Sequence, residues 1–280
     1  MKNSLQKFLL IALLLALPIT TFAKSKEKEY STYCPLHTAL EFNIGGGAWK
    51  DKYMSYYTYS GTSFSVGAEM MRAGKNESKW VQQHQLRYMY NSGTISLSDK
   101  GKSKSHLFNY TFGYMYNQTV APKLRLYYGF DINALGGYFD NAHKGNNPIS
   151  IKGDLSLGFT GMAVYDFHLG KRPITARYQM SLPVFATFIQ VEQGYSNIIG
   201  AWHLTTWDGH FNMRNRLLFD LHFDSWALRL GYNNDIMTYY ATTNHFQYVS
   251  HNLVVGFAGD LMRWSEKNMN KKIKSAIYTY

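Results

Sequence analysis

Apolar and polar residues alternate along most of this chain. After Lys123, for example, Leu124 and Leu126 fall on one face of an extended chain, and Arg125 and Tyr127 fall on the other. Successive side chains of a β-strand point to opposite faces, so this period of two predicts strands with one apolar face. About ten such segments follow one another. They cover residues 38–48, 62–73, 79–91, 106–117, 123–138, 150–168, 174–188, 211–223, 225–240 and 247–262.

The connectors between these segments alternate between long and short. The predicted long connectors lie around residues 50–61, 92–105, 139–149, 189–210 and 241–246. The predicted short connectors lie at residues 74–78, 118–122, 169–173 and 224. An even number of strands, long extracellular loops and short periplasmic turns are typical of bacterial outer-membrane barrels. The pattern therefore predicts that both chain termini lie in the periplasm.

The predicted fold is a single antiparallel up-and-down transmembrane β-barrel of about ten strands, in the all-β class. A soluble β-sandwich also alternates. Here, however, the apolar face extends over about ten residues, which is the length of a tilted membrane strand. The mid-strand charges then face a polar lumen, while the apolar face meets lipid. An alternative divides residues 191–206 into another hairpin and gives twelve strands.

The N-terminus has the pattern of a secretory signal peptide. Lys2 and Lys7 precede an apolar run over residues 8–17, Pro18 ends the run, and residues 21–23 form a cleavage site. The predicted organisation is then a signal peptide, an N-terminal periplasmic segment, a barrel and a basic periplasmic tail. These four parts cover residues 1–23, 24–37, 38–262 and 263–280.

Composition fits a barrel better than a helical membrane protein. The mean hydropathy is −0.31 and the chain holds one cysteine, so no intrachain disulfide supports the fold. The 23 tyrosines suit the aromatic girdles that mark both membrane interfaces. Tyrosines near strand ends are predicted to form these girdles. They are Tyr53, Tyr56, Tyr57, Tyr59, Tyr88, Tyr90, Tyr114, Tyr116, Tyr138, Tyr239 and Tyr240.

The net charge of +11 gathers mainly in connectors and tails. A basic chain suits nucleic acid or an anionic lipid surface. No nucleic-acid-binding motif accompanies the lysines, so lipid is favoured and a nucleic-acid partner is not expected. The expected location is the outer membrane of a Gram-negative bacterium. The expected partners are outer-membrane lipid and lipopolysaccharide, the barrel assembly machinery, and an unknown surface ligand or protein.

The polar phase of the strands predicts a set of charged lumen residues. They are Glu41, Glu69, Arg87, Arg125, Asp131, Asp154, Asp166, Arg177, Arg214, Arg216, Asp220, Arg229, Asp235 and Asp260. A polar conduit, and so a narrow pore, is one interpretation. The favoured one is a paired ion network that plugs the barrel, because buried charges need partners and small barrels fill their interior.

Asp208 and His210 form a candidate catalytic pair before a strand. An Asp two residues from a His on an extended chain lies on the same side, where it can orient the His as a base. The pair resembles the Asp-x-His pair of omptins, surface proteases built on ten-stranded barrels. Omptins also need an acidic pair across the barrel mouth, where this chain offers only Asp99 among lysines. A plain Asp-Gly turn is therefore favoured over a hydrolase.

Other candidate chemistry is weaker. Ser250 and His251 are adjacent, so on a strand they point to opposite faces and cannot act together. His203, His210 and His245 lack the spacing of a metal site. No cofactor or metal is expected.

Three stretches of this sequence resemble an uncharacterised family of outer-membrane β-barrel proteins from Bacteroidota, known as a domain of unknown function. The stretches are Asp51-Lys52-Tyr53-Met54-Ser55-Tyr56 with Tyr59-Ser60-Gly61, Leu182-Pro183 with Gly194-Tyr195-Ser196, and Phe219-Asp220 followed by Leu228-Arg229-Leu230-Gly231-Tyr232. The resemblance spans most of the chain after residue 23. It implies a membrane barrel and no particular activity.

The leading functional hypothesis is therefore a non-enzymatic outer-membrane barrel. It would serve a structural role, or bind a ligand or partner through its extracellular loops. Tyr195, Trp202 and Trp207, in the connector over residues 189–210, are the expected binding anchors, because aromatic residues dominate binding hot spots. A surface hydrolase and a narrow pore are the alternatives.

Overall fold

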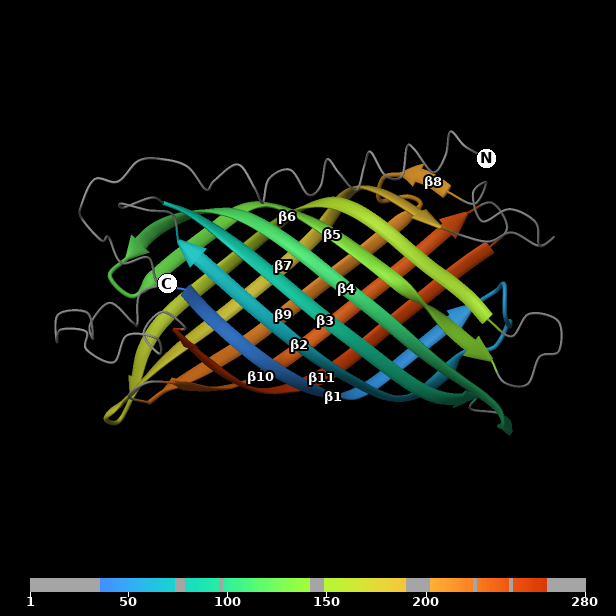
Figure 1. Ribbon diagram of the computed structural model, residues 1–280, viewed down its shortest axis with the longest axis horizontal. Coiled ribbons are helices and arrows are strands. Elements are labelled where there is room, and N and C mark those ends of the chain that lie inside the picture. Colours follow the sequence, from blue (N-terminus) through green and yellow to red (C-terminus); the bar gives the residue numbers. More distant parts are fainter. Residues whose placement is uncertain are drawn as a thin grey trace, which may run out of the picture. The chain divides into compact units, whose positions relative to one another are not determined.

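The computed structural model describes residues 36–73, 79–95, 98–141, 149–189, 202–223, 226–241 and 244–260. The predicted signal peptide and basic tail lie outside these residues. Eleven strands make up the described part (Figure 1). They are β1 (Leu36–Asp51), β2 (Tyr59–Ala73), β3 (Trp80–Ile95), β4 (Ser98–Ala121), β5 (Leu124–Asn141), β6 (Ile149–Leu169), β7 (Arg172–Ile189), β8 (Trp202–Thr205), β9 (His210–His222), β10 (Ala227–Ala241) and β11 (Asn244–Asp260).

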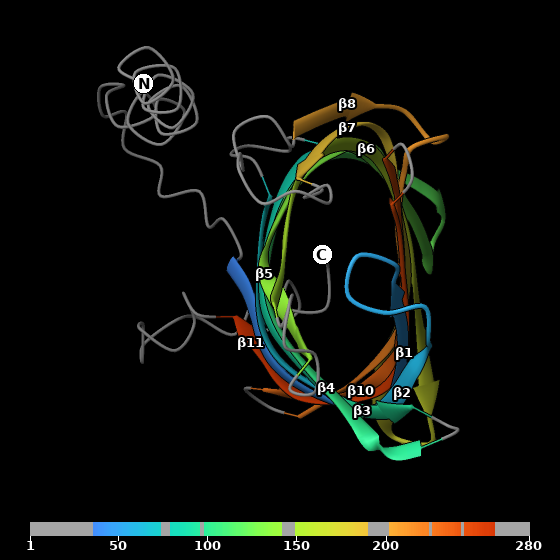
Figure 2. The ribbon, with the colours of Figure 1, turned by 90° about the vertical axis from the view of Figure 1, so that its right-hand side faces the viewer.

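Ten of these strands close into an antiparallel barrel. Strands β1 to β7 pair with one another in sequence order. Strand β7 then pairs with β9, β9 with β10, β10 with β11, and β11 with β1. Figure 2 shows this ring of strands. Closure leaves no unpaired edge strand in the ring, and neighbouring strands satisfy most of its backbone groups. The predicted ten-stranded up-and-down barrel is confirmed.

The alternative of twelve barrel strands is wrong for the part of the chain that the structure describes. Strand β8 lies in the segment that would have formed the extra hairpin, but it pairs only with β7, from Ala186–Thr205 to Ile189–Trp202. Residues 190–201 lie outside the described residues. No helix among the described residues is long and apolar enough to cross a membrane.

Two predicted loops are largely strand. The connector predicted around residues 92–105 is wrong, because β3 runs to Ile95, β4 starts at Ser98, and Ser92 pairs with Lys104. Likewise, β10 extends to Ala241 and β11 begins at Asn244, so both reach into the connector predicted over residues 241–246. The buried residues of β4 near Lys104 are small and polar serines, so the alternation of apolar and polar residues that marks a strand is missing there.

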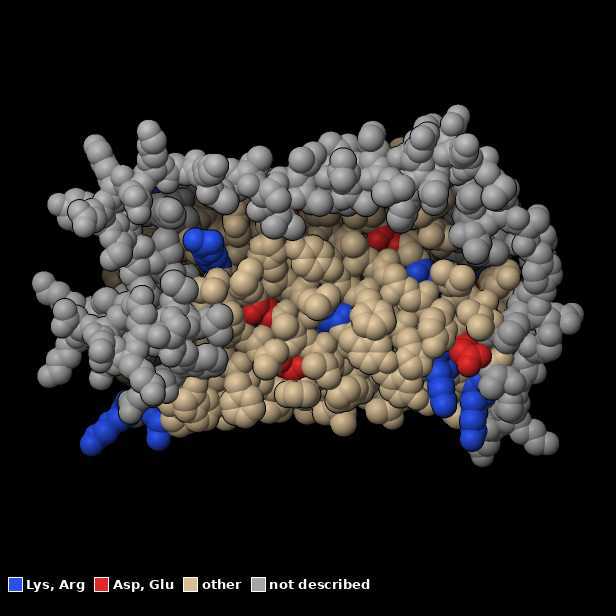
Figure 3. Space-filling model, in the orientation of Figure 1, with Lys and Arg blue, Asp and Glu red and all other residues tan. Residues whose placement is uncertain are grey.

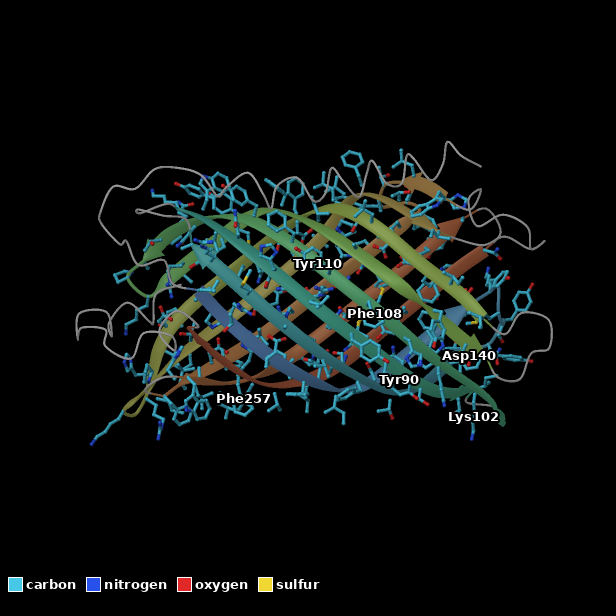
Figure 4. The ribbon with its side chains drawn as sticks, in the orientation of Figure 1. Tyr90, Lys102, Phe108, Tyr110, Asp140 and Phe257 are labelled. Carbon is cyan, nitrogen blue, oxygen red and sulfur yellow. The ribbon has the colours of Figure 1, made fainter. Side chains whose placement is uncertain are left out.

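The outer surface of the barrel is apolar along its middle. Phe159 and Leu253 are 67% and 65% exposed, and the face in Figure 3 is mostly uncharged, with Lys and Arg side chains projecting at its two ends. Figure 4 shows Phe108 on the outside of β4 and Lys102 near one end of the strands. Such an apolar band suits a barrel that spans lipid.

Two tyrosines of the predicted girdles lie inside instead. Tyr59 and Tyr239 are buried, and Tyr239 follows the same inward phase as Met237 on β10. Its neighbour Tyr240 is exposed. Tyrosine is compatible with either face of a strand near a membrane interface. Whether a given tyrosine, such as Tyr239 or Tyr240, points inward or outward therefore depends only on the alternation along the strand.

Candidate functional site

Charged side chains from five strands meet inside the barrel, around Arg229 of β10. Its guanidinium donates to both carboxylate oxygens of Asp220, from Nε and Nη2 at 2.7 Å each. Its Nη1 donates to Glu41 at 2.7 Å and to Glu69 at 2.6 Å. Arg229 has no exposed surface. One arginine thus joins β10 to β9, β1 and β2.

Glu69 is the acceptor at the centre of this group. Besides Arg229, it accepts from Nη2 of Arg177 at 2.5 Å and from the side chains of Gln83 and Gln85 at 2.5 and 3.3 Å. Arg177 belongs to β7, so its bond to β2 crosses the lumen. Buried carboxylates are stable when several donors surround them.

Arg216 closes the same group on the side of β9. Its Nη2 donates to both oxygens of Glu41, at 2.6 and 2.7 Å, and its Nη1 lies 3.6 Å from Glu69. Its Nε donates to Asn233 at 3.3 Å. The three arginines and three carboxylates of the group compensate one another.

A second, smaller set of ion pairs, centred on Asp235, lies beside this group. Arg87 donates to both oxygens of Asp235, at 2.8 and 2.7 Å. Arg214 also reaches Asp235, with Nε at 3.2 Å from Oδ1. Its remaining nitrogens donate to Gln85, Thr111 and Asn109.

The other predicted lumen charges lie apart from these groups. Arg125 pairs with Asp166 at 2.5 Å. Asp154 accepts from the Tyr239 hydroxyl at 2.5 Å. Oδ2 of Asp131 is buried and has no hydrogen-bond partner among the described residues. The side chain of Asp260 lies outside the described residues.

The end of the barrel that bears the loops is filled by apolar and aromatic residues. The cluster includes Trp49, Met54, Phe139, Phe188 and Tyr248. Met54 belongs to the connector after β1, and this connector turns into the barrel (Figure 2). The interior is therefore filled on the loop side of the ion network as well.

A buried ion pair that the sequence analysis missed holds this connector at its start. Nζ of Lys152 lies 2.8 Å from Oδ2 of Asp51, and Ser150 donates to the same oxygen at 2.7 Å. Both charged side chains are almost fully buried. The alternation along the strand could have identified Lys152. It precedes Asp154 by two residues, so on a strand both side chains point to the same, inward face.

The structure does not bring Asp208 and His210 together. Oδ1 of Asp208 accepts from the hydroxyls of Thr206 and Thr205, at 2.9 and 3.2 Å. These two hydrogen bonds lower the pKa of Asp208 below its ordinary value. The carboxylate therefore caps an exposed turn, as in the plain-turn interpretation.

His210 instead points into the barrel. Its ring stacks on Tyr239, with centroids 5.0 Å apart, and it is almost fully buried. The carboxylate near it is Asp154, whose Oδ2 lies 3.7 Å from Nε2. A buried His next to an exposed Asp cannot form a base that acts on a surface substrate.

The residues of the other weak candidates for chemistry also do not come together. Ser250 is buried, whereas His251 faces outward and meets the hydroxyl of Tyr232. No group of three or more His, Cys, Asp or Glu residues in the described ranges could hold a metal ion.

Two of the expected binding anchors are exposed on the barrel wall. Trp202 lies on β8 and Trp207 in the turn that follows it, and both side chains are exposed. Nε1 of Trp207 donates to the carbonyl oxygen of Pro183 on β7. Tyr195 lies outside the described residues. The indole of Trp207 thus rests on the wall against β7.

Fold and interior together define a membrane-type β-barrel whose lumen is filled. The chain belongs to the family described as Protein of unknown function (DUF3316), which matches residues 7–268. This family assignment carries no activity. The Bacteroidota origin that the resemblance implies stays a prediction. No curated protein matches the chain.

Solved barrels resemble the chain only distantly. The outer membrane protease OmpT from Escherichia coli has 5% identity and a TM-score of 0.44, with 85% of this chain and 100% of that chain covered. The β domain of the Bordetella autotransporter BrkA has 9% identity and a TM-score of 0.43, with 81% and 100% covered. The translocator domain of NalP from Neisseria meningitidis has 10% identity and a TM-score of 0.39, with 93% and 98% covered. These likenesses carry no argument about function.

Proposed function

We propose that the protein is a closed barrel of the outer membrane of a Gram-negative bacterium, and that it works by binding a ligand or partner at the end where its longer connectors lie. The single observation that carries this proposal is the filled interior. A continuous ion network and an aromatic cluster occupy the space that a conduit would need.

Burial of the charges supports a closed state over a narrow pore. Arg229 and Glu69 have almost no exposed surface. Water that crossed the barrel would solvate these groups, and ions would compete with their partners. Conduction would therefore require several ion pairs to separate at once.

Conductance in planar bilayers tests the closed state. The folded protein is expected to give currents at the level of a protein-free bilayer. Flotation of the same preparation with liposomes verifies insertion, and a heat-denatured sample serves as control. Discrete current steps that appear with the folded protein and vanish on denaturation would overturn the closed barrel.

Labelling in intact cells tests the location and orientation. A cysteine at Leu204, at the loop end, is expected to react with a membrane-impermeant maleimide, whereas a cysteine at Leu169, at the opposite end, should react only after the outer membrane is permeabilised. Both positions are exposed in the structure. Both variants carry Cys34→Ser. The reverse pattern would contradict the periplasmic placement of the termini.

A further inference from the structure

The wall of the barrel is interrupted between β7 and β9. The two strands pair from Ile174 to Ser181, which lies opposite Arg214. Beyond this point β7 pairs with β8 from Ala186 onward, and the start of β9 pairs with β10. Residues 182–185 of β7 and 210–213 of β9 therefore flank a gap in the hydrogen-bond ladder between these two strands.

Among the described residues, a short turn and one indole cover this gap. The turn over residues 206–209 is held by the backbone N–H groups of Gly209 and His210, which donate to the carbonyl of Thr206 at 3.3 and 3.1 Å. The Trp207 ring donates to Pro183 across the gap. A single side-chain hydrogen bond is weaker than a strand ladder, so this part of the wall opens more readily than the rest.

A polar cavity of about 20 Å³ lies directly behind the gap. Ser181 and Pro183 line it from β7, and Asn212 and Arg214 line it from β9. Asp131 lines it from β5, which is joined to β7 through β6: Asp131 pairs with Gly158, and Gly158 pairs with Pro183. This volume accommodates a group of about the size of one water molecule. It admits a small polar head and excludes a bulky one.

The cavity presents one acceptor that the protein leaves unmatched. Asp131 is 4% exposed, and its Oδ2 has no hydrogen-bond partner among the described residues. The guanidinium of Arg214 does not supply the missing donor, because its bonds run to Asp235, Gln85 and other groups. A buried carboxylate oxygen in this position favours a cationic hydrogen-bond donor.

The outer rim of the gap is apolar. Leu204 of β8 is 85% exposed, and Phe185 and Trp207 are 55% and 59% exposed. An acyl chain placed against these side chains would remove apolar surface from contact with water or lipid headgroups. The polar cavity and its apolar rim together match a molecule with a small cationic head and a long chain.

We propose that the gap between β7 and β9 is a lateral binding site for an amphiphile with a primary ammonium head. The head enters beneath Trp207 and donates to Asp131, and the chain lies against Leu204 and Phe185. This site rests on the proposed membrane location, and it names the class of ligand that the closed barrel would bind.

Titration calorimetry of the folded protein in nonionic micelles tests the head group. Decylamine, protonated at pH 7, is expected to bind saturably at one site per chain. Decyltrimethylammonium has the same charge and chain, but it is too large for the cavity and cannot donate, so it should bind about tenfold more weakly or not at all. Ethylamine, which lacks the chain, should also bind about tenfold more weakly.

Substitutions with matched controls test which residues of the barrel bind the head and the chain of the ligand. Asp131→Asn should weaken decylamine binding about tenfold or more, whereas Asp166→Asn, at a carboxylate already paired with Arg125, should leave it unchanged. Leu204→Ser should weaken the binding of decylamine but not that of ethylamine. Leu169→Ser, an exposed substitution at the other end of the barrel, is its matched control. Far-ultraviolet circular dichroism and heat-modifiable gel migration verify that each variant is folded.

Equal binding of decylamine and decyltrimethylammonium, or wild-type affinity in Asp131→Asn, would overturn the head-group assignment. Absence of saturable binding would mean that the cavity holds water only. The proposed function fails separately, through channel currents or through cell fractionation that places the protein outside the outer membrane. Binding in micelles is independent of both results.

Discussion

Two parts of the barrel wall differ in how completely they are joined. From β2 to β5 the strands pair along almost their full length, from Tyr59–Ile95 to Ala73–Val81 between β2 and β3, for example. Between β7 and β9 the pairing stops at Ser181, and a turn with one indole covers the rest. Complete ladders stabilise a fold, whereas regions of low local stability are where ligands enter and elements move.

The interior also contains a fully paired group of side chains and an incompletely paired one. Arg229 alone joins β1, β2, β9 and β10, and every hydrogen-bonding nitrogen of this arginine has a carboxylate partner. Behind the gap, Asp131 keeps an unmatched oxygen. We therefore expect the network around Arg229 to supply rigidity, and the cavity behind the gap to be the place where a ligand binds.

The largest expected effect is the loss of the central arginine. Arg229→Ala leaves Asp220, Glu41 and Glu69 with fewer donors in a buried position, so it should lower the free energy of unfolding by about 3–5 kcal/mol. Urea titration in lipid vesicles, followed by tryptophan fluorescence, measures this change. Lys102→Ala, at an exposed lysine, should change it by less than about 0.5 kcal/mol. Equal effects of the two substitutions would show that the network adds no stability.

Glycine substitutions compare the two parts of the wall directly. A Cβ at Gly137 would overlap the backbone of His106 on the fully paired side, and one at Gly158 would overlap that of Leu182 at a register shift beside the gap. Gly137→Ala should cost about 1–3 kcal/mol. Gly158→Ala should cost less, because β7 is free of β9 at that level. Gly161→Ala meets nothing within 4 Å and is the control. A larger cost at Gly158 than at Gly137 would contradict the proposed difference in rigidity.

The smallest effect is expected at the cover of the gap. Trp207→Ala removes one hydrogen bond from a half-exposed ring, so it should lower stability by about 1 kcal/mol or less. It should nonetheless speed hydrogen exchange of the amides near Pro183, measured by mass spectrometry. Trp202→Ala, on the neighbouring β8, should leave exchange there unchanged. Identical exchange in the two variants would mean that Trp207 does not hold the gap closed.

The sequence predicted the barrel because alternation is a local property of each strand. The phase assigned to Leu124 and Arg125 agrees with the structure, in which Arg125 is buried and Leu124 is partly exposed. Where the inward residues are small and polar, as at Ser103 and Ser105, the two faces of the strand no longer differ in hydrophobicity. The pattern there predicts a loop, although the structure has a strand.

The candidate site was harder to predict, because it depends on contacts between distant segments. The inward position of Glu69 followed from strand phase, but its contact with Arg177 joins residues 108 positions apart. Spacing placed Asp208 and His210 on one side of an extended chain, whereas a turn at Gly209 separates them. The gap between β7 and β9 leaves no trace in the hydrophobic pattern, because it depends on which strand β7 pairs with.

The pairing of β1 with β11 has a consequence for biogenesis. The hydroxyl of Thr38 donates to the carbonyl oxygen of Gly259, 221 positions away, so the ring cannot close until β11 has reached β1. Until then both end strands carry unpaired backbone groups, which bind readily to other strands. Closure across such a sequence separation is slow. Pairing of β11 with β1 therefore removes two exposed strand edges in one event.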